Sequence, residues 1–204
     1  MRATTLTLIS VSLDEVRAVL GRPASEHEGV AAVIDERAAW EPEKVPFGQQ
    51  VVSADEALRT VLAGGPWVPG GVKMYWYALD RVCRAWAWAI ETMPWDAAEG
   101  VAEALVRLGM PGDHLPQAWL SRTPRLGLEV TALPQVGRVE YAQALEALPF
   151  YEAVLEADLR DEPAQAEVTQ VSGDLVACLH GLAEWGREAR AVGRPQPDLV
   201  VVLG

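Results

Sequence analysis

The chain has 204 residues, of which 50% are hydrophobic, and its formal net charge at pH 7 is −12. This length and apolar content suffice for a globular core without disulfides or metal ions, and we predict a single domain over residues 1–204. The excess of acidic side chains excludes a nucleic-acid-binding surface, because that affinity depends on Lys and Arg side chains that neutralise phosphates.

The two cysteines and the lengths of the apolar segments bear on metal sites, disulfides and cellular location. Cys83 and Cys178 each lie among apolar residues, which predicts buried free thiols and neither a disulfide framework nor a zinc site. We therefore expect no metal and no cofactor. The apolar stretch from Leu6 to Val11 is too short for a signal peptide, and no window approaches the roughly 18 apolar residues of a membrane span. These features favour a cytoplasmic protein that does not bind membranes.

The first quarter of the chain predicts a strand followed by helices. Thr5–Val11 is rich in residues that favour strands. Ser12 and Ser53 are each followed by a Glu three residues later, which is the spacing of a capping box, and each predicts the start of a helix. Another helix is expected from about Glu28 to Trp40.

The most regular helical pattern runs from Val72 to Glu91. Its apolar stripe is wide enough for burial on more than one side, and it consists of Trp76, Leu79, Cys83, Trp86 and Ile90. Trp76 and Trp86 are therefore predicted to be mostly buried. Asp96 predicts the cap of the next helix.

The second half of the chain predicts three more helices and a terminal strand. Residues 110–125, which contain three prolines, are expected to be irregular. A strand at 126–130 and a turn at 134–137 should follow them. Helices are expected over about 139–148, 150–159 and 164–191. The apolar run Asp198–Leu203 predicts a strand buried on both faces. It should share one small sheet with Thr5–Val11, in a mostly helical α+β fold.

The order of short motifs resembles a known group. The motifs are Gly70-Gly71 leading into Tyr75, then Ala78-Leu79, Val82-Cys83 and a Pro134-x-Val136-Gly137 turn before a helix. Together with the two terminal strands they resemble the YfbM-like group of small bacterial proteins of unknown function. The resemblance implies an α+β fold and a bacterial cytoplasmic protein, and it implies no catalytic residues.

Two features are candidates for a binding site. Between residues 152 and 162 the acidic side chains outnumber the single Arg160 and would attract a basic partner over a long range; they are Glu152, Glu156, Asp158, Asp161 and Glu162. Trp67 lies between two prolines, and an exposed Trp on a stiff loop is typical of an interface hot spot. The alternatives are a solvated helix face for the acidic run and a loop-packing role for Trp67.

A second group of residues would suit a small polar pocket. Carboxylates and arginines in an irregular segment are a common site composition, and this group consists of Asp113, His114, Arg122 and Arg125. The alternative is an ordinary surface loop. A Cys–His nucleophile would require Cys83 or Cys178 to meet His114 through the fold.

Two functions remain open. The first is a non-catalytic binding protein for a basic protein partner, for example an immunity-type neutraliser of a cationic toxin; a homo-oligomer is also compatible with the sequence. The second is a small-molecule-binding or hydrolytic enzyme with its site near Asp113 and His114. A pocket with carboxylates converging on His114 would favour the enzyme, and a flat acidic face with a protruding Trp67 would favour the binder.

Overall fold

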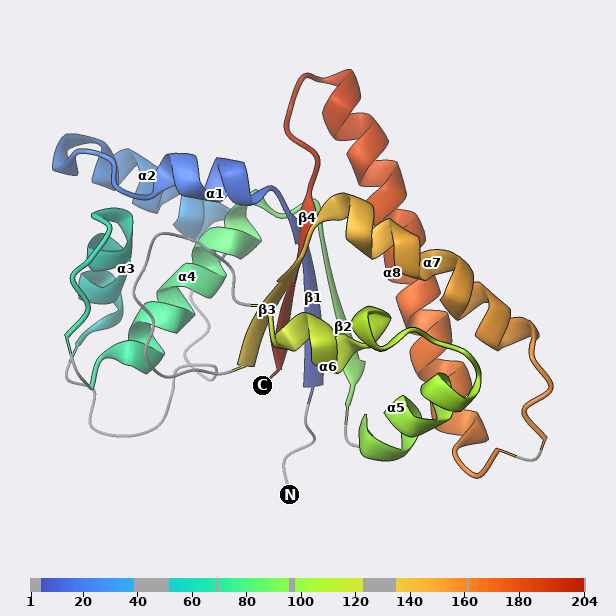
Figure 1. Ribbon diagram of the computed structural model, residues 1–204. Helices are drawn as coiled ribbons and strands as arrows, with labels where there is room; N and C mark the ends of the chain where they lie inside the picture. Colours follow the sequence, from blue (N-terminus) through green and yellow to red (C-terminus); the bar gives the residue numbers. More distant parts are fainter. Residues whose placement is uncertain are drawn as a thin grey trace. The chain divides into compact units, whose positions relative to one another are not determined.

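The computed structural model describes residues 5–38, 52–68, 70–95, 98–122, 135–160 and 162–203. The described chain is a mostly helical α+β fold, as predicted, and its small sheet has four strands (Figure 1). It divides into two compact units, one that contains the sheet and one whose described part is helical. Each unit is described by itself.

The two terminal strands lie side by side in the sheet. The strands are β1 (Thr5–Val11), β2 (Ala89–Pro94), β3 (Gln135–Val139) and β4 (Asp198–Leu203), in the order β2-β1-β4-β3. β1 pairs antiparallel with β2, and β3 pairs antiparallel with β4. Leu199, Val200 and Val201 are all buried, and because neighbouring residues point to opposite faces, both faces of β4 are covered. The predicted shared sheet is confirmed.

The predicted helix over 72–91 is too long. Helix α4 spans Val72–Trp86, and Ala87 turns the backbone to an extended conformation before β2 begins. Ile90, which we placed on the helical stripe, is 39% exposed on a strand at the edge of the sheet. Trp76 is buried as predicted, whereas Trp86 is only half-buried. The apolar spacing does not reveal this change, because pairing with β1 satisfies the backbone groups of residues 89–94 through a distant segment.

The proline-rich segment is more regular than predicted. It contains a short 3-10 helix, η2 (Gly112–His114), and helix α6 (Pro116–Leu120), with Pro116 at the first position, where a helix does not need its N–H. The predicted turn at 134–137 is wrong, because β3 begins at Gln135. Gly137 allows α6 to approach β3: a Cβ there would lie 1.9 Å from the Trp119 carbonyl oxygen. The predicted strand at 126–130, like the Asp96 cap, lies outside the described residues.

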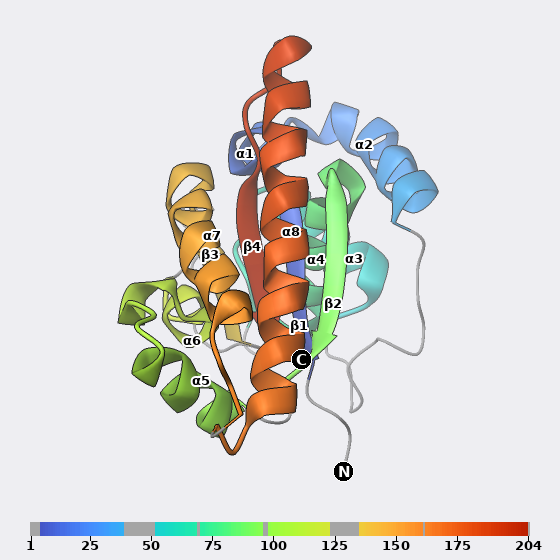
Figure 2. The same ribbon diagram turned by 90° about the vertical axis from the view of Figure 1, so that its right-hand side faces the viewer.

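Two long helices pack against each other and against the sheet (Figure 2). Helix α7 (Tyr141–Glu156) is continuous through Pro149, where we expected two helices, and α8 (Gln165–Ala191) is the predicted long helix. Gly186 allows their close approach, since a Cβ there would lie 2.3 Å from the Tyr141 ring. Helix α5 (Ala98–Arg107) packs on α8.

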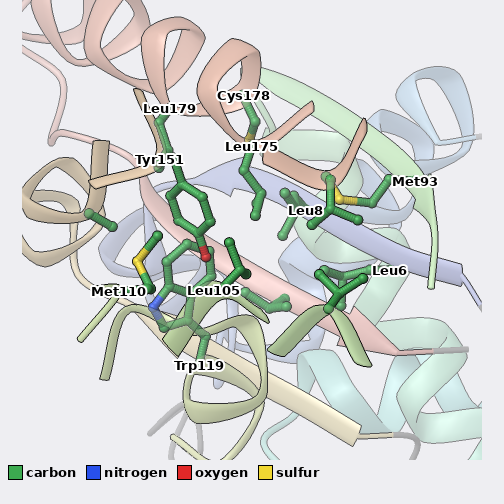
Figure 3. Packing of buried hydrophobic residues seen from close by; sticks show 14 of the residues in the cluster. Leu6, Leu8, Met93, Leu105, Met110, Trp119, Tyr151, Leu175, Cys178 and Leu179 are labelled. Atoms are coloured by element: carbon green, nitrogen blue, oxygen red, sulfur yellow. The ribbon is translucent and has the colours of Figure 1, made fainter. Parts of the chain in front are cut away.

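The core of the sheet unit lies between the sheet and these helices (Figure 3). Trp119 of α6 and Tyr151 of α7 meet edge to face, with ring centroids 6.3 Å apart, and both are fully buried. Leu175 and Cys178 of α8 point toward Leu8 of β1 in Figure 3. This packing fixes the positions of α5, η2 and α7.

In the helical unit, α1 (Leu13–Val19), α2 (Ala24–Arg37) and α3 (Ala54–Leu62) pack on α4. The two predicted caps are confirmed, because the Ser12 and Ser53 hydroxyls each accept a hydrogen bond of 3.3 Å from the backbone N–H three residues later. Helix α2 lies a few residues earlier than predicted. Arg81 of α4 is buried, where it donates to the Ala38 carbonyl at 3.1 Å and pairs with Asp35.

Candidate protein-interaction surface

The acidic run, which begins within α7, is partly paired with side chains of other elements. Glu152 Oε1 lies 3.0 Å from His180 Nε2 of α8. Glu162 accepts a hydrogen bond of 2.6 Å from Arg107 of α5, and its side chain is only 11% exposed. Both contacts join elements of the fold, and the Arg107 cation offsets the negative charge of Glu162.

Asp158 is paired within the run itself. The Arg160 Nε donates to both carboxylate oxygens of Asp158, at 2.8 and 3.0 Å. Hydrogen bonds from Arg160 hold the pKa of Asp158 below its ordinary value, so the carboxylate stays ionised but is accompanied by a cation. Glu156 is exposed and has no ion-pair partner among the described residues. Asp161 lies outside them.

Helix α7 presents a wide exposed face that carries no Lys or Arg. Glu146, Glu152 and Glu156 lie on this face, between Phe150 at one margin and Leu155 at the other, as follows from 100° per residue. Phe150 is 37% exposed, and its ring lies 5.2 Å from the His114 ring. The side chains at this margin are therefore aromatic as well as acidic.

An open groove of about 410 Å³ lies beside this margin. Four of its five lining residues come from the outward face of α5, and the fifth follows His114; they are Ala102, Glu103, Val106, Arg107 and Leu115. Val106 is 52% exposed, whereas Val101, Ala104 and Leu105 on the opposite face of α5 are buried. We call the groove with these five lining residues the α5 groove.

The main-chain carbonyls of Asp113 and His114 accept hydrogen bonds from side chains of other elements. The Asp113 carbonyl accepts hydrogen bonds from Trp119 Nε1 at 3.2 Å and from Arg122 Nη2 at 3.0 Å. The His114 carbonyl accepts one of 2.8 Å from the Tyr151 hydroxyl. The structure therefore brings Asp113, His114 and Arg122 together through main-chain atoms.

No carboxylate is hydrogen-bonded to the His114 imidazole among the described residues. The second arm of Arg122 donates to Gln143 Oε1 at 3.1 Å. Arg125, the last of this predicted group, lies outside the described residues.

Trp67 packs within its own unit. Its ring stacks on Tyr75 with centroids 5.0 Å apart and meets Trp76 edge-on at 6.2 Å. The Tyr75 hydroxyl accepts a hydrogen bond of 3.3 Å from the Val68 N–H, which fixes the loop. Trp67 is half-buried, so this geometry corresponds to the loop-packing alternative.

Both thiols are buried and free, as predicted. Burial, the largest cause in each case, raises the pKa of Cys83 and of Cys178 to about 12. The thiolate form that a nucleophile requires is therefore strongly disfavoured at neutral pH. Cys178 belongs to the core shown in Figure 3.

Sequence reasoning missed Val106, Leu115 and Phe150 as candidate site residues. Helical periodicity marks an apolar residue as a core candidate, and only the packed structure shows which ones remain exposed. Two signals were available: α7 has no basic residue, and Pro149 stands directly before Phe150.

The described ranges contain no cluster of three His, Cys, Asp or Glu residues arranged to hold a metal ion. None of the helices in these ranges has both the length and the apolar content that crossing a membrane requires. No curated protein and no solved structure matches the chain. Residues 3–203 match one family, described as "Domain of unknown function (DUF7691)". Since the match covers nearly all of the chain, the protein belongs to this family.

Proposed function

We propose that this protein is a cytoplasmic, non-catalytic binding protein whose partner is a basic protein. The observation that carries the proposal is the exposed Phe150 on a helix face that has three Glu and no Lys or Arg. Exposed aromatic side chains supply binding energy at interface centres, and a charged rim increases the association rate. Phe150 would be the anchor, and the carboxylates of α7 would attract the partner.

The ion pairs determine which carboxylates matter for attraction. Asp158 pairs with Arg160, and Glu162 is largely buried beside Arg107. Glu152 contacts the His180 ring. Glu146 and Glu156 are exposed and have no ion-pair partner among the described residues. No nearby cation among the described residues therefore offsets their negative charge. They add to the long-range electrostatic attraction of a chain whose net charge is −12.

Affinity capture from the host of origin, followed by binding kinetics, tests the proposal. The captured partner should be basic, and its association rate should fall as salt rises, because the Debye length is about 8 Å at physiological ionic strength. Neutralising Glu146→Gln and Glu156→Gln together should slow association and leave dissociation nearly unchanged. Phe150→Ser should raise Kd by about tenfold or more, mainly through faster dissociation.

A matched control is the pair Glu167→Gln and Glu188→Gln, two exposed carboxylates of α8. This pair makes the same charge change outside α7 and should slow association less. Recovery of only the protein itself, or binding that responds neither to salt nor to the α7 changes, would contradict the proposal. If the partner is toxic alone and harmless when co-expressed with this chain, the protein is its neutraliser.

A further inference from the structure

The α5 groove has a mostly apolar lining with one carboxylate, that of Glu103. Ala102 and Val106 lie one helical turn apart on the outward face of α5, and Leu115 also lines the groove. Val106 is 52% exposed, although β-branched aliphatic residues are usually buried. Covering this side chain with an aliphatic group of a partner would remove apolar area from water on both molecules.

The charges at the rim of the groove favour a cation on the occupant. Glu103 is exposed and has no ion-pair partner among the described residues. Arg107, the basic residue of the lining, donates to Glu162 at 2.6 Å, so its charge is offset by that carboxylate. A Lys or Arg near the seated side chain would therefore meet an available carboxylate at Glu103.

The groove adjoins the anchor of the proposed interface. Leu115 lines the groove, and His114, the residue before it, contacts the Phe150 ring at a centroid distance of 5.2 Å. A partner that covers Phe150 would therefore lie beside a residue that adjoins the groove lining. An amphipathic helix suits both features, since helices present apolar and charged side chains at spacings of three and four residues.

We propose that the α5 groove seats an aliphatic side chain of a basic amphipathic helix, whose Lys or Arg one turn away pairs with Glu103. This inference rests on the proposed function and specifies the chemistry of the partner.

The probe is a capped peptide of about 20 residues, long enough to be helical alone, with Leu and Lys repeated at four-residue spacing in Ala. Nitrogen-15 NMR titration of the full chain should show amide shift changes concentrated at residues 102–107 and at Leu115. A peptide with Glu in place of Lys should bind at least about tenfold more weakly, and so should a version with a central Pro that breaks the helix.

Substitutions in the groove test whether Val106 and Glu103 contact the peptide. Val106→Ser should weaken binding of the Lys peptide at least about tenfold, whereas Val192→Ser, at another exposed valine outside the groove, should leave it unchanged. Glu103→Lys should reverse the preference, so that the Glu peptide binds better. Each variant is first checked by its thermal melt, and both valines are exposed, so folding should be retained.

Several results would overturn the inference: no binding at millimolar peptide, shift changes outside the groove, equal binding of the Pro peptide, or an unchanged preference in Glu103→Lys. Suppose that binding of the native partner still requires Phe150, while Val106→Ser and Glu103→Lys change the binding of neither the native partner nor the peptides. The inference then fails and the proposed function stands. If no basic partner exists, the proposed function fails by its own test, whatever the peptides do.

Discussion

At the scale of single residues, glycines determine how closely two elements approach, and ion pairs determine which carboxylates remain uncompensated. Gly137 and Gly186 each stand where a Cβ would overlap a neighbouring element. Gly173, also in α8, has no atom within 4 Å of the place where its Cβ would lie. The same amino acid thus has a packing role at two sites and none at the third.

Gly186→Ala should destabilise the protein by about 1–3 kcal/mol, the usual cost of overpacking, because the new methyl group meets the Tyr141 ring. Gly173→Ala is the matched control and should be neutral or stabilising by up to about 1 kcal/mol, since Ala favours a helix interior. Urea unfolding measures both changes. Equal effects of the two substitutions would contradict the close packing of α7 on α8.

The Asp158–Arg160 pair gives a prediction about pH. Hydrogen bonds from Arg160 lower the pKa of Asp158, so any stabilisation from the pair is present above the unfolded-state pKa and is lost as pH falls through the folded-state pKa. Arg160→Gln should return the pKa of Asp158 toward its ordinary 3.8.

Carbon-13 NMR titration of the side-chain carboxyl groups measures this shift. Arg187→Gln, which removes another exposed arginine, should leave the midpoint of Asp158 unchanged. A midpoint that is the same with and without Arg160 would show that the pair does not form in solution.

At the scale of elements, the region around α4 and β2 shows how distant pairing overrides a local pattern. Trp86 lies at the last position of α4 and is half-buried, whereas Trp119 of the five-residue helix α6 is fully buried. The more regular apolar stripe therefore contains the less buried tryptophan. Burial depends on what packs over a residue, and a stripe within one segment does not specify that.

Trp119→Ala should cost about 3–5 kcal/mol, because it empties a site in contact with Tyr151. Trp86→Ala should cost less, because part of its ring is already in water. Chemical denaturation of the two variants, compared with the parent, tests the order. An equal or larger loss for Trp86→Ala would contradict the partial exposure of its ring.

At the scale of the whole molecule, the first and the last strand lie side by side at the centre of the sheet. β1 and β4 are the inner strands, and β4 separates β1 from β3. Its central residues are buried on both faces. The sheet therefore requires the last segment of the chain to complete its backbone hydrogen bonds.

Removing residues 198–204 should abolish cooperative folding of the sheet unit, because β1 and β3 each lose a partner strand. Circular dichroism during heating, with the full-length chain as reference, should show no cooperative transition for that unit. Recovery of a truncated chain whose sheet unit melts cooperatively would contradict the central position of β4.

Part of the proposed interaction surface could be predicted from the sequence. The local excess of carboxylates around Glu156 is visible there, because charge is a property of composition. The exposure of Phe150 and Val106, and the pairing of Glu162 with Arg107, are not visible. They depend on how α5, η2 and α7 pack, which involves residues far apart in the chain. Trp67 shows the converse, since its packing on Tyr75 makes it less available than its loop context suggests.

The sequence by itself determined the features whose causes are local. The caps at Ser12 and Ser53 follow from a hydroxyl and a nearby amide, and the strands at Thr5–Val11 and Asp198–Leu203 follow from runs of β-favouring apolar residues. Only the tertiary structure decided that residues 89–94 leave the helical pattern and that residues 135–139 form a strand. In both cases the backbone groups are satisfied by a strand distant in sequence, β1 or β4, and the free energy of that pairing is not encoded in the local pattern.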